Sequence, residues 1–161
     1  MQLQKPGTFE TTRLHKVTHN MSRFYVVVFE GGPEQTSTSF LSFSKAVESS
    51  KLFGNAHMPI TWLTIPAQRG PSAFGLLDGT PLGRVCFDQK QIAPTIYGVD
   101  VKKGVVVVLR LDVWIGTGTV LGSEAVKELE TYFSSFLLIG SQYNWIYLNR
   151  NIAISVLNSE E

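Results

Sequence analysis

The chain has 161 residues, of which 43% are hydrophobic and 17% are charged, and its formal net charge is +1. This length and composition fit one ordinary globular domain and leave too few residues for two separate cores. Its 14 basic residues are scattered rather than clustered. The sequence therefore lacks the basic patch of a nucleic-acid-binding protein, and no nucleic-acid partner is expected.

The cysteine count and the hydropathy pattern bear on location. Cys86 is the single cysteine, which excludes an intramolecular disulfide and every CxxC redox or zinc motif and favours a reducing compartment. The N-terminal segment has no apolar signal-peptide core, and no stretch approaches the roughly 18 apolar residues of a membrane span. We therefore expect a cytoplasmic chain without membrane contact.

The first part of the chain predicts an arm followed by a β-α-β unit. Residues 1–22 are polar and broken by a Pro-Gly turn, which indicates an extended arm or linker. The run FYVVVF at residues 24–29 predicts a buried central strand. Spaced apolar residues between positions 36 and 53 predict a helix, and ITWLTI at residues 60–65 predicts a second strand. A helical crossover between two strands makes them parallel neighbours.

The second part predicts a loop, a hairpin and a helix. Residues 66–83 are rich in turn-forming residues and indicate a surface loop, and residues 84–88 form a short strand or turn. The run GVVVVLRL at residues 104–111 is the strongest strand signal, and VWIG at residues 113–116 follows at hairpin distance. An apolar stripe over residues 123–139 predicts an amphipathic helix.

This order of elements predicts an α/β thioredoxin-like fold, with a mixed central sheet and flanking helices, but without the CxxC motif. The predicted organisation is an N-terminal arm of residues 1–22, a thioredoxin-like domain of residues 23–139 and a C-terminal extension of residues 140–161. The extension contains apolar, β-prone pieces that need a pairing partner.

The positions of the cysteine and the histidines limit the thiol and metal chemistry that this chain can support. A thioredoxin-fold enzyme places its reactive cysteine at the start of the first helix, where the helix N-terminus lowers the thiol pKa. This chain reads EGGPEQTSTS there, and Cys86 lies far along the sequence, where we interpret it as a small buried hydrophobe. The one close pair of histidines, His15 and His19, lies in the polar arm, and His57 is isolated. No metal site is expected.

Two groups of side chains remain open to alternative interpretations. The Arg110–Asp112 pair follows a buried strand, where charges cost desolvation unless they reach water or a partner. A solvated hairpin turn is the favoured interpretation and a functional pair is the alternative. Trp62, Tyr97 and Trp114 either line a pocket for an aromatic ligand or pack in the core, and core packing is favoured because aromatic residues dominate cores.

Six segments carry a family resemblance: PGTFETTRL, RFYVVVF, IYGVD, GVVVVLRLD, WIGT and ELETYFSSFL. Together they span most of residues 5–138, and their order resembles the C-terminal thioredoxin-like domain of FAD-dependent aromatic hydroxylases of the phenol 2-monooxygenase type. In that family the flavin lies in preceding domains. The resemblance therefore implies that this chain binds no cofactor and that FAD belongs to a parent or partner protein.

One position departs from the family pattern. The usual Arg-Pro-Asp after the valine-rich strand is Arg110-Leu111-Asp112 here. Because a proline would rigidify the turn, Leu111 puts the family's turn geometry in doubt. The tail after Leu138 has no counterpart in the family.

The resemblance implies a non-redox module that acts in dimerisation or in docking to a flavin-dependent hydroxylase, with a second copy or that hydroxylase as the partner. The alternative is a stand-alone, cofactor-independent enzyme of the cyclase, dehydratase or isomerase type, acting on an aromatic or polyketide-like small molecule. Its acid, base or anion-holding candidates are Tyr97, His57, Arg110 and Asp112. Its ligand-pocket candidates are Gly32, Gln35, Trp62 and Trp114.

Overall fold

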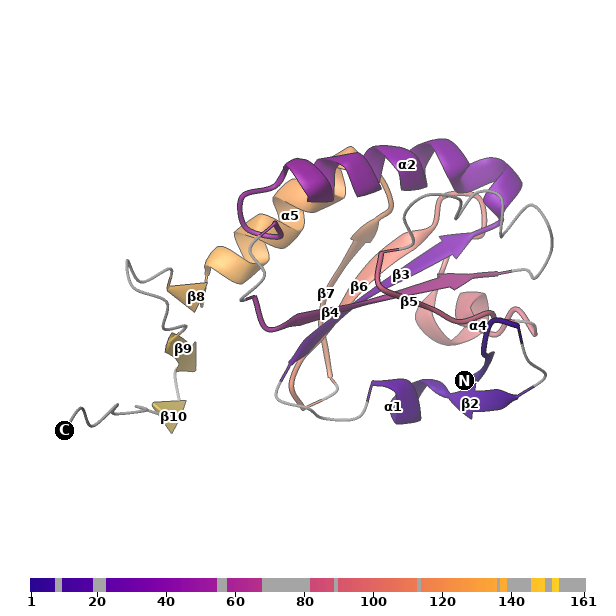
Figure 1. Cartoon of the computed structure of the whole chain (residues 1–161), viewed down its shortest axis with the longest axis horizontal. Coiled ribbons are helices and arrows are strands. Elements are labelled where there is room, and N and C mark those ends of the chain that lie inside the picture. Colours follow the sequence, from indigo (N-terminus) through magenta and orange to yellow (C-terminus); the bar gives the residue numbers. More distant parts are fainter. Residues whose placement is uncertain are drawn as a thin grey trace.

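The structure is a computed structural model of the chain (Figure 1). It describes residues 1–7, 10–18, 23–54, 58–67, 82–88, 90–112 and 114–135, and the backbone of three later strands, β8 (Leu137–Leu138), β9 (Ile146–Asn149) and β10 (Ile152–Ala153). Most of the surface loop predicted for residues 66–83, and most of the predicted C-terminal extension, lie outside the described residues.

A mixed five-stranded sheet forms the centre of the molecule, in the order β5-β4-β3-β6-β7. Its strands are β3 (Phe24–Gly31), β4 (Ile60–Pro66), β5 (Arg84–Val85), β6 (Val105–Leu109) and β7 (Ile115–Val120). Strands β3, β4 and β5 are parallel, whereas β6 is antiparallel to β3 and β7 is antiparallel to β6. The parallel β-α-β unit and the hairpin predicted from the sequence are both present.

Strand β3 occupies the middle of the sheet, and all eight of its residues are buried. Val27, for example, lies opposite Leu63 of β4 and Val107 of β6. Side chains of a strand alternate between the two faces of a sheet, so a strand covered on both faces needs apolar residues at successive positions. This requirement explains the unbroken run FYVVVF.

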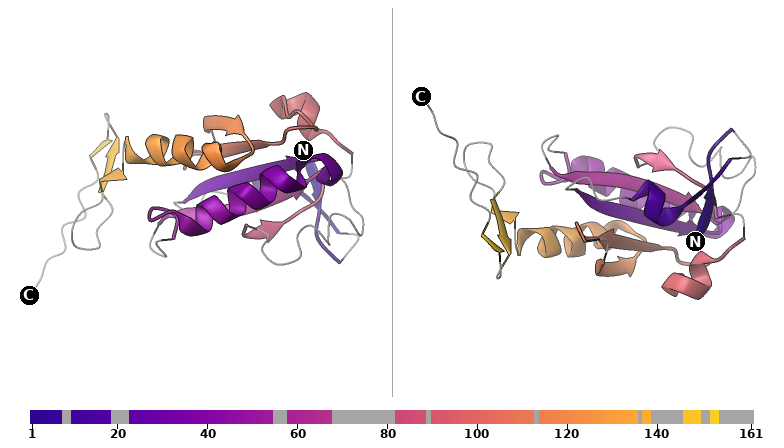
Figure 2. Two further views of the ribbon diagram at one scale, coloured as in Figure 1. Left: turned by 90° about the horizontal axis from the view of Figure 1, so that it is seen from above. Right: turned by 90° about the horizontal axis from the view of Figure 1, so that it is seen from below.

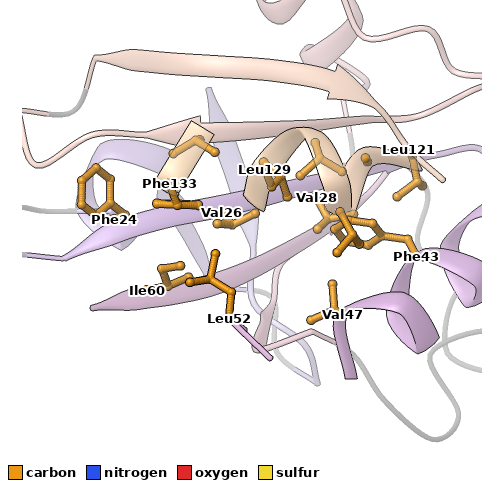
Figure 3. Packing of buried hydrophobic residues seen from close by; sticks show 14 of the residues in the cluster. Phe24, Val26, Val28, Phe43, Val47, Leu52, Ile60, Leu121, Leu129 and Phe133 are labelled. Atoms are coloured by element: carbon orange, nitrogen blue, oxygen red, sulfur yellow. The ribbon is translucent and has the colours of Figure 1, made fainter. Parts of the chain in front are cut away.

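Helices α2 (Pro33–Ser49) and α5 (Ser123–Ser134) lie side by side over one face of the sheet (Figures 1 and 2). Side chains from these helices and from the strands form the helix-side core (Figure 3). Phe133 of α5 is fully buried there and meets the ring of Phe24 edge to face, with 5.4 Å between the ring centroids. The start of α2 at Pro33 is earlier than the spacing of apolar residues suggested, because proline suits the first turn of a helix.

The opposite face carries the N-terminal segment and α4 (Ala93–Tyr97) (Figure 1). The arm predicted for residues 1–22 is described at residues 1–7 and 10–18, which instead form the strands β1 (Gln2–Gln4) and β2 (Thr11–Arg13) of a hairpin, followed by α1 (Leu14–Val17). Leu3, Leu14 and Val17 are buried in the core of this face. The sequence does not predict this packing, because these few apolar residues are too widely spaced to form a periodic pattern.

Within the described part of the chain, no helix combines the length and the apolar character needed to cross a membrane.

Replacing Phe133 by alanine should lower the free energy of unfolding by about 3–5 kcal/mol, because it leaves a cavity in the helix-side core. Urea unfolding of the two proteins measures this difference. Leu41→Ala on α2 is the matched control, since Leu41 is an exposed apolar residue of the neighbouring helix, and it should change stability by less than about 0.5 kcal/mol. Equal losses for the two variants would contradict the assignment of Phe133 to the core.

Candidate functional site

A groove of about 460 Å³ lies where α1, α4 and the β6–β7 hairpin meet. Its volume falls within the range of roughly 300–1,000 Å³ typical of small-molecule sites. The lining side chains come from separate parts of the chain: Leu14, His15, Thr18, Tyr97, Leu109, Asp112, Trp114 and Ile115. Only the tertiary structure brings these residues together.

Tyr97 is the best-positioned polar side chain of the groove. Its ring stacks on the buried ring of Phe29, with 5.1 Å between centroids and an interplanar angle of 28°. Gly98 follows in the left-handed conformation (φ 63°), which ends α4 directly after Tyr97. Burial raises the pKa of the Tyr97 phenol, so the hydroxyl stays protonated and serves as a hydrogen-bond donor at neutral pH.

The hairpin turn forms another wall of the groove. Arg110 Nη2 and Asp112 Oδ2 are 3.1 Å apart, and the Trp114 backbone N–H donates to Asp112 Oδ1 at 3.2 Å. The Arg110 N–H donates to the Trp114 carbonyl at 2.8 Å, which closes the turn. Arg110 and Asp112 are half-exposed, so this ion pair contributes at most about 1 kcal/mol to stability. Leu111, where the family pattern has proline, packs partly against the helix-side core.

Trp114 lines the groove but is 75% exposed, and Ile115 beside it is 56% exposed. Large apolar side chains of this kind are normally covered by protein. The groove thus combines buried apolar residues, an exposed indole and several hydrogen-bonding groups.

The remaining sequence candidates lie elsewhere. Trp62 packs against Phe43 and Phe53 in the helix-side core. Gly32 precedes α2 and donates its N–H to the Val101 carbonyl at 2.8 Å, and Gln35 is exposed on the first turn of that helix.

His57 and His19 lie outside the described residues. His15 and Thr18 line the groove although sequence reasoning assigned them no site role, and a four-residue helix gives no periodic signal that would have revealed them. In the described ranges, no three His, Cys, Asp or Glu side chains come together as metal ligands.

Glu30 is a second unusual feature: it is the second-last residue of β3 and lies three residues before the start of α2 at Pro33. It is fully buried, and neither carboxylate oxygen has a hydrogen-bond partner in the described part of the structure. The pairing of β3 with β4 shifts register between Phe29 and Gly31, on either side of it, and such irregularities often lie beside functional sites. Burial raises the pKa of Glu30 to about 7. The signal in the sequence is a single acid directly after six apolar residues.

Cys86 is 1% exposed, and its backbone N–H donates to the Thr64 carbonyl of β4 at 3.0 Å. Burial raises the pKa of its thiol. Both properties favour the thiol over the reactive thiolate.

No protein-family model matches the chain, and no curated protein matches it in sequence. Solved structures do match. A secreted disulfide oxidoreductase of Mycobacterium tuberculosis, described as homologous to DsbE of E. coli, has a TM-score of 0.58 and 13% identity, covering 84% of this chain and 96% of that one. The thioredoxin domain of a thiol-disulfide oxidoreductase from Bacteroides vulgatus has a TM-score of 0.57 and 10% identity, covering 82% and 91%.

The bacterioferritin comigratory protein of Xanthomonas campestris, studied for alkyl peroxide reduction, has a TM-score of 0.55 and 13% identity, covering 81% of this chain and 89% of that one. At such low identity these similarities show the fold alone. The predicted thioredoxin-like α/β fold is therefore confirmed.

The resemblance to phenol hydroxylase C-terminal domains is wrong by the same comparison, because the similar structures are thiol:disulfide oxidoreductases and a peroxide-reducing protein. The function expected from that resemblance was a non-redox module for dimerisation or hydroxylase docking, with a cofactor-independent enzyme as the alternative. This functional hypothesis is contradicted together with the resemblance. The reason is physical: the quoted segments include β3, β6 and most of α5, whose apolar patterns are required by the fold itself.

Replacing Glu30 by glutamine should make stability less dependent on pH. The folded chain holds the Glu30 proton up to about pH 7, against a usual pKa of 4.5. The contribution of protonated Glu30 is thus complete below pH 4.5 and is lost as the pH rises to about 7. Above that pH, Glu30→Gln should be more stable than the wild type by at most about 3 kcal/mol, and the difference should shrink toward acid.

Urea unfolding at pH values between 4 and 8.5 measures this effect. The exposed residue Glu128 of α5 provides the control variant Glu128→Gln, which should show the pH dependence of the wild type. A constant stability difference between Glu30→Gln and the wild type across this range would show that Glu30 does not titrate as described.

Proposed function

We propose that this thioredoxin-fold domain binds a small aromatic molecule in the groove between α1, α4 and the β6–β7 hairpin. The observation that carries the proposal is the convergence of Tyr97 and Trp114 on one groove, although they lie on separate elements. Leu14 and Leu109 supply buried apolar surface next to them. Such a combination of apolar walls with a few directed polar groups is typical of ligand pockets.

The polar groups define the kind of ligand that fits. The protonated Tyr97 hydroxyl donates a hydrogen bond, and the half-exposed Asp112 carboxylate accepts one. The imidazole of His15 lines the same groove. An aromatic ring that carries a hydroxyl or amino substituent satisfies these groups, whereas a purely aliphatic molecule leaves them unpaired.

Trp114 supplies the main driving force in this proposal. A ligand that covers about 100 Å² of its exposed indole would gain roughly 2–3 kcal/mol from the hydrophobic effect, and a stacked ring adds to this gain.

Titration of the chain with 2-naphthol tests the proposal by fluorescence and by chemical-shift changes. We expect binding that Trp114→Ala weakens at least about tenfold, since tenfold corresponds to only 1.4 kcal/mol. Tyr97→Phe should weaken it less, because it removes one hydrogen bond and keeps the ring. Ile96→Ala is the matched control, since Ile96 is exposed on α4 next to Tyr97 but does not line the groove. Unchanged binding by Trp114→Ala would refute the proposal.

Thiol chemistry is the second candidate function, favoured by the oxidoreductases among the similar structures. In this chain it would run through Cys86. Its thiolate would attack a substrate disulfide, form a mixed disulfide and release the other sulfur as a thiolate, and a second thiol compound would then free Cys86 as a thiolate. The single cysteine also supports a cytoplasmic location, which we propose with either function.

Because Cys86 is buried, this candidate requires the region around β5 to open. Reaction of the native chain with an aromatic disulfide reagent measures the access of the thiol, and Cys86→Ser is the control without a thiol. If the candidate holds, the chain speeds the reduction of insulin disulfides by a dithiol and Cys86→Ser does not. Equal rates for the two proteins would exclude it.

A further inference from the structure

A second, smaller pocket of about 250 Å³ lies on the N-terminal hairpin and the start of α1. All of its lining residues are polar or charged: Gln2, Lys5, Thr11, Thr12, Arg13 and Lys16. None of them lines the groove described above. The pocket therefore differs from the groove in chemistry, and the two sites are tested by different variants.

The fold holds this pocket in place through the backbone. Gln4 and Phe87 exchange two backbone hydrogen bonds of 2.9 Å, which tie β1 to the segment after β5. The Leu14 N–H donates to the Met1 carbonyl at 3.1 Å, which ties α1 to the start of β1. Leu3 of β1 is also buried. Its burial and these hydrogen bonds hold the backbone that carries the polar side chains of the pocket.

The hairpin and the helix also fix the side chains relative to one another. Gln2 lies opposite Arg13 in the β1–β2 register, and its side-chain amide donates to the Thr11 hydroxyl at 2.8 Å. Strand β2 continues directly into α1. Arg13 and Lys16 are three residues apart across this junction, and both line the pocket.

Positively charged side chains dominate the lining of this pocket. Lys5, Arg13 and Lys16 line it, and Glu10 is the acid beside them, bonded to the Lys5 ammonium at 2.7 Å. This hydrogen bond lowers the pKa of Glu10 and keeps it ionised. Three cationic side chains thus line one small pocket. Such a group of cations attracts an anion.

We propose that this pocket binds a phosphate-type dianion, carried by a small molecule. The planar guanidinium of Arg13 suits two oxygens of a tetrahedral anion, and the ammonium groups of Lys5 and Lys16 add positive charge. The pocket is larger than a phosphate ion needs, so it leaves room for a short organic body.

Calorimetric titration of the full chain with inorganic phosphate, sulfate and phenyl phosphate tests this inference. We expect both inorganic dianions to bind, the affinity to fall as sodium chloride is added, and phenyl phosphate to bind at least as tightly as phosphate. Arg13→Ala and Lys16→Ala should each weaken binding at least about tenfold. Lys45→Ala is the matched control, because it removes one exposed positive charge from α2, away from the pocket.

A gain-of-function variant makes the test independent of unfolding. Glu10→Gln removes the carboxylate that holds Lys5, so phosphate should bind more tightly than to the wild type. Binding of 2-naphthol should not change in Arg13→Ala, since Arg13 does not line the groove, and its loss there would show a folding defect instead. Two results would overturn the inference. One is that phosphate does not bind the wild type even at about 50 mM. The other is that the wild type, Arg13→Ala and Glu10→Gln bind phosphate with equal affinity.

Discussion

The burial of β3 on both faces is the constraint on which the rest of the structure depends. The side chains of Val26, Val27 and Val28 are inaccessible to solvent, so the sheet needs a cover on each side. The parallel pairing with β4 requires a crossover, which α2 supplies on one face. Strand β6 pairs antiparallel with β3 and forms a hairpin with β7, and α5 follows β7 in the chain.

The opposite face of the sheet is covered by shorter elements, and these leave part of it open as a groove. Helices α1 and α4 have four and five residues, and between them and the hairpin the groove remains open. Helix α1 borders both hollows: Leu14 and His15 line the groove, while Lys16 and the preceding Arg13 line the smaller pocket. The N-terminal segment therefore completes the core of one face and also lines the groove and the smaller pocket.

The fold of this chain does not determine which reactive side chains it carries. Its architecture is similar to that of thiol:disulfide oxidoreductases, but its single cysteine lies after β5 rather than at the start of α2. At the start of α2 the chain has Gly32 and Pro33, and the buried acid Glu30 lies two residues before Gly32. A fold positions loops and strand ends without dictating what they carry, so function has to be argued from the side chains found there.

The sequence by itself determined the central strands, the two long helices, the hairpin and the fold class, because each depends on a local pattern of apolar residues and turn formers. It also placed Arg110 and Asp112 at a half-exposed turn. It did not reveal the packing of Leu3, Leu14 and Val17, the place of His15 in the groove, or which of Trp62 and Trp114 would pack against the core. Only the tertiary structure decided these points, as it decided the raised pKa of Glu30, because burial depends on which distant segments pack against a residue and not on its neighbours in the chain.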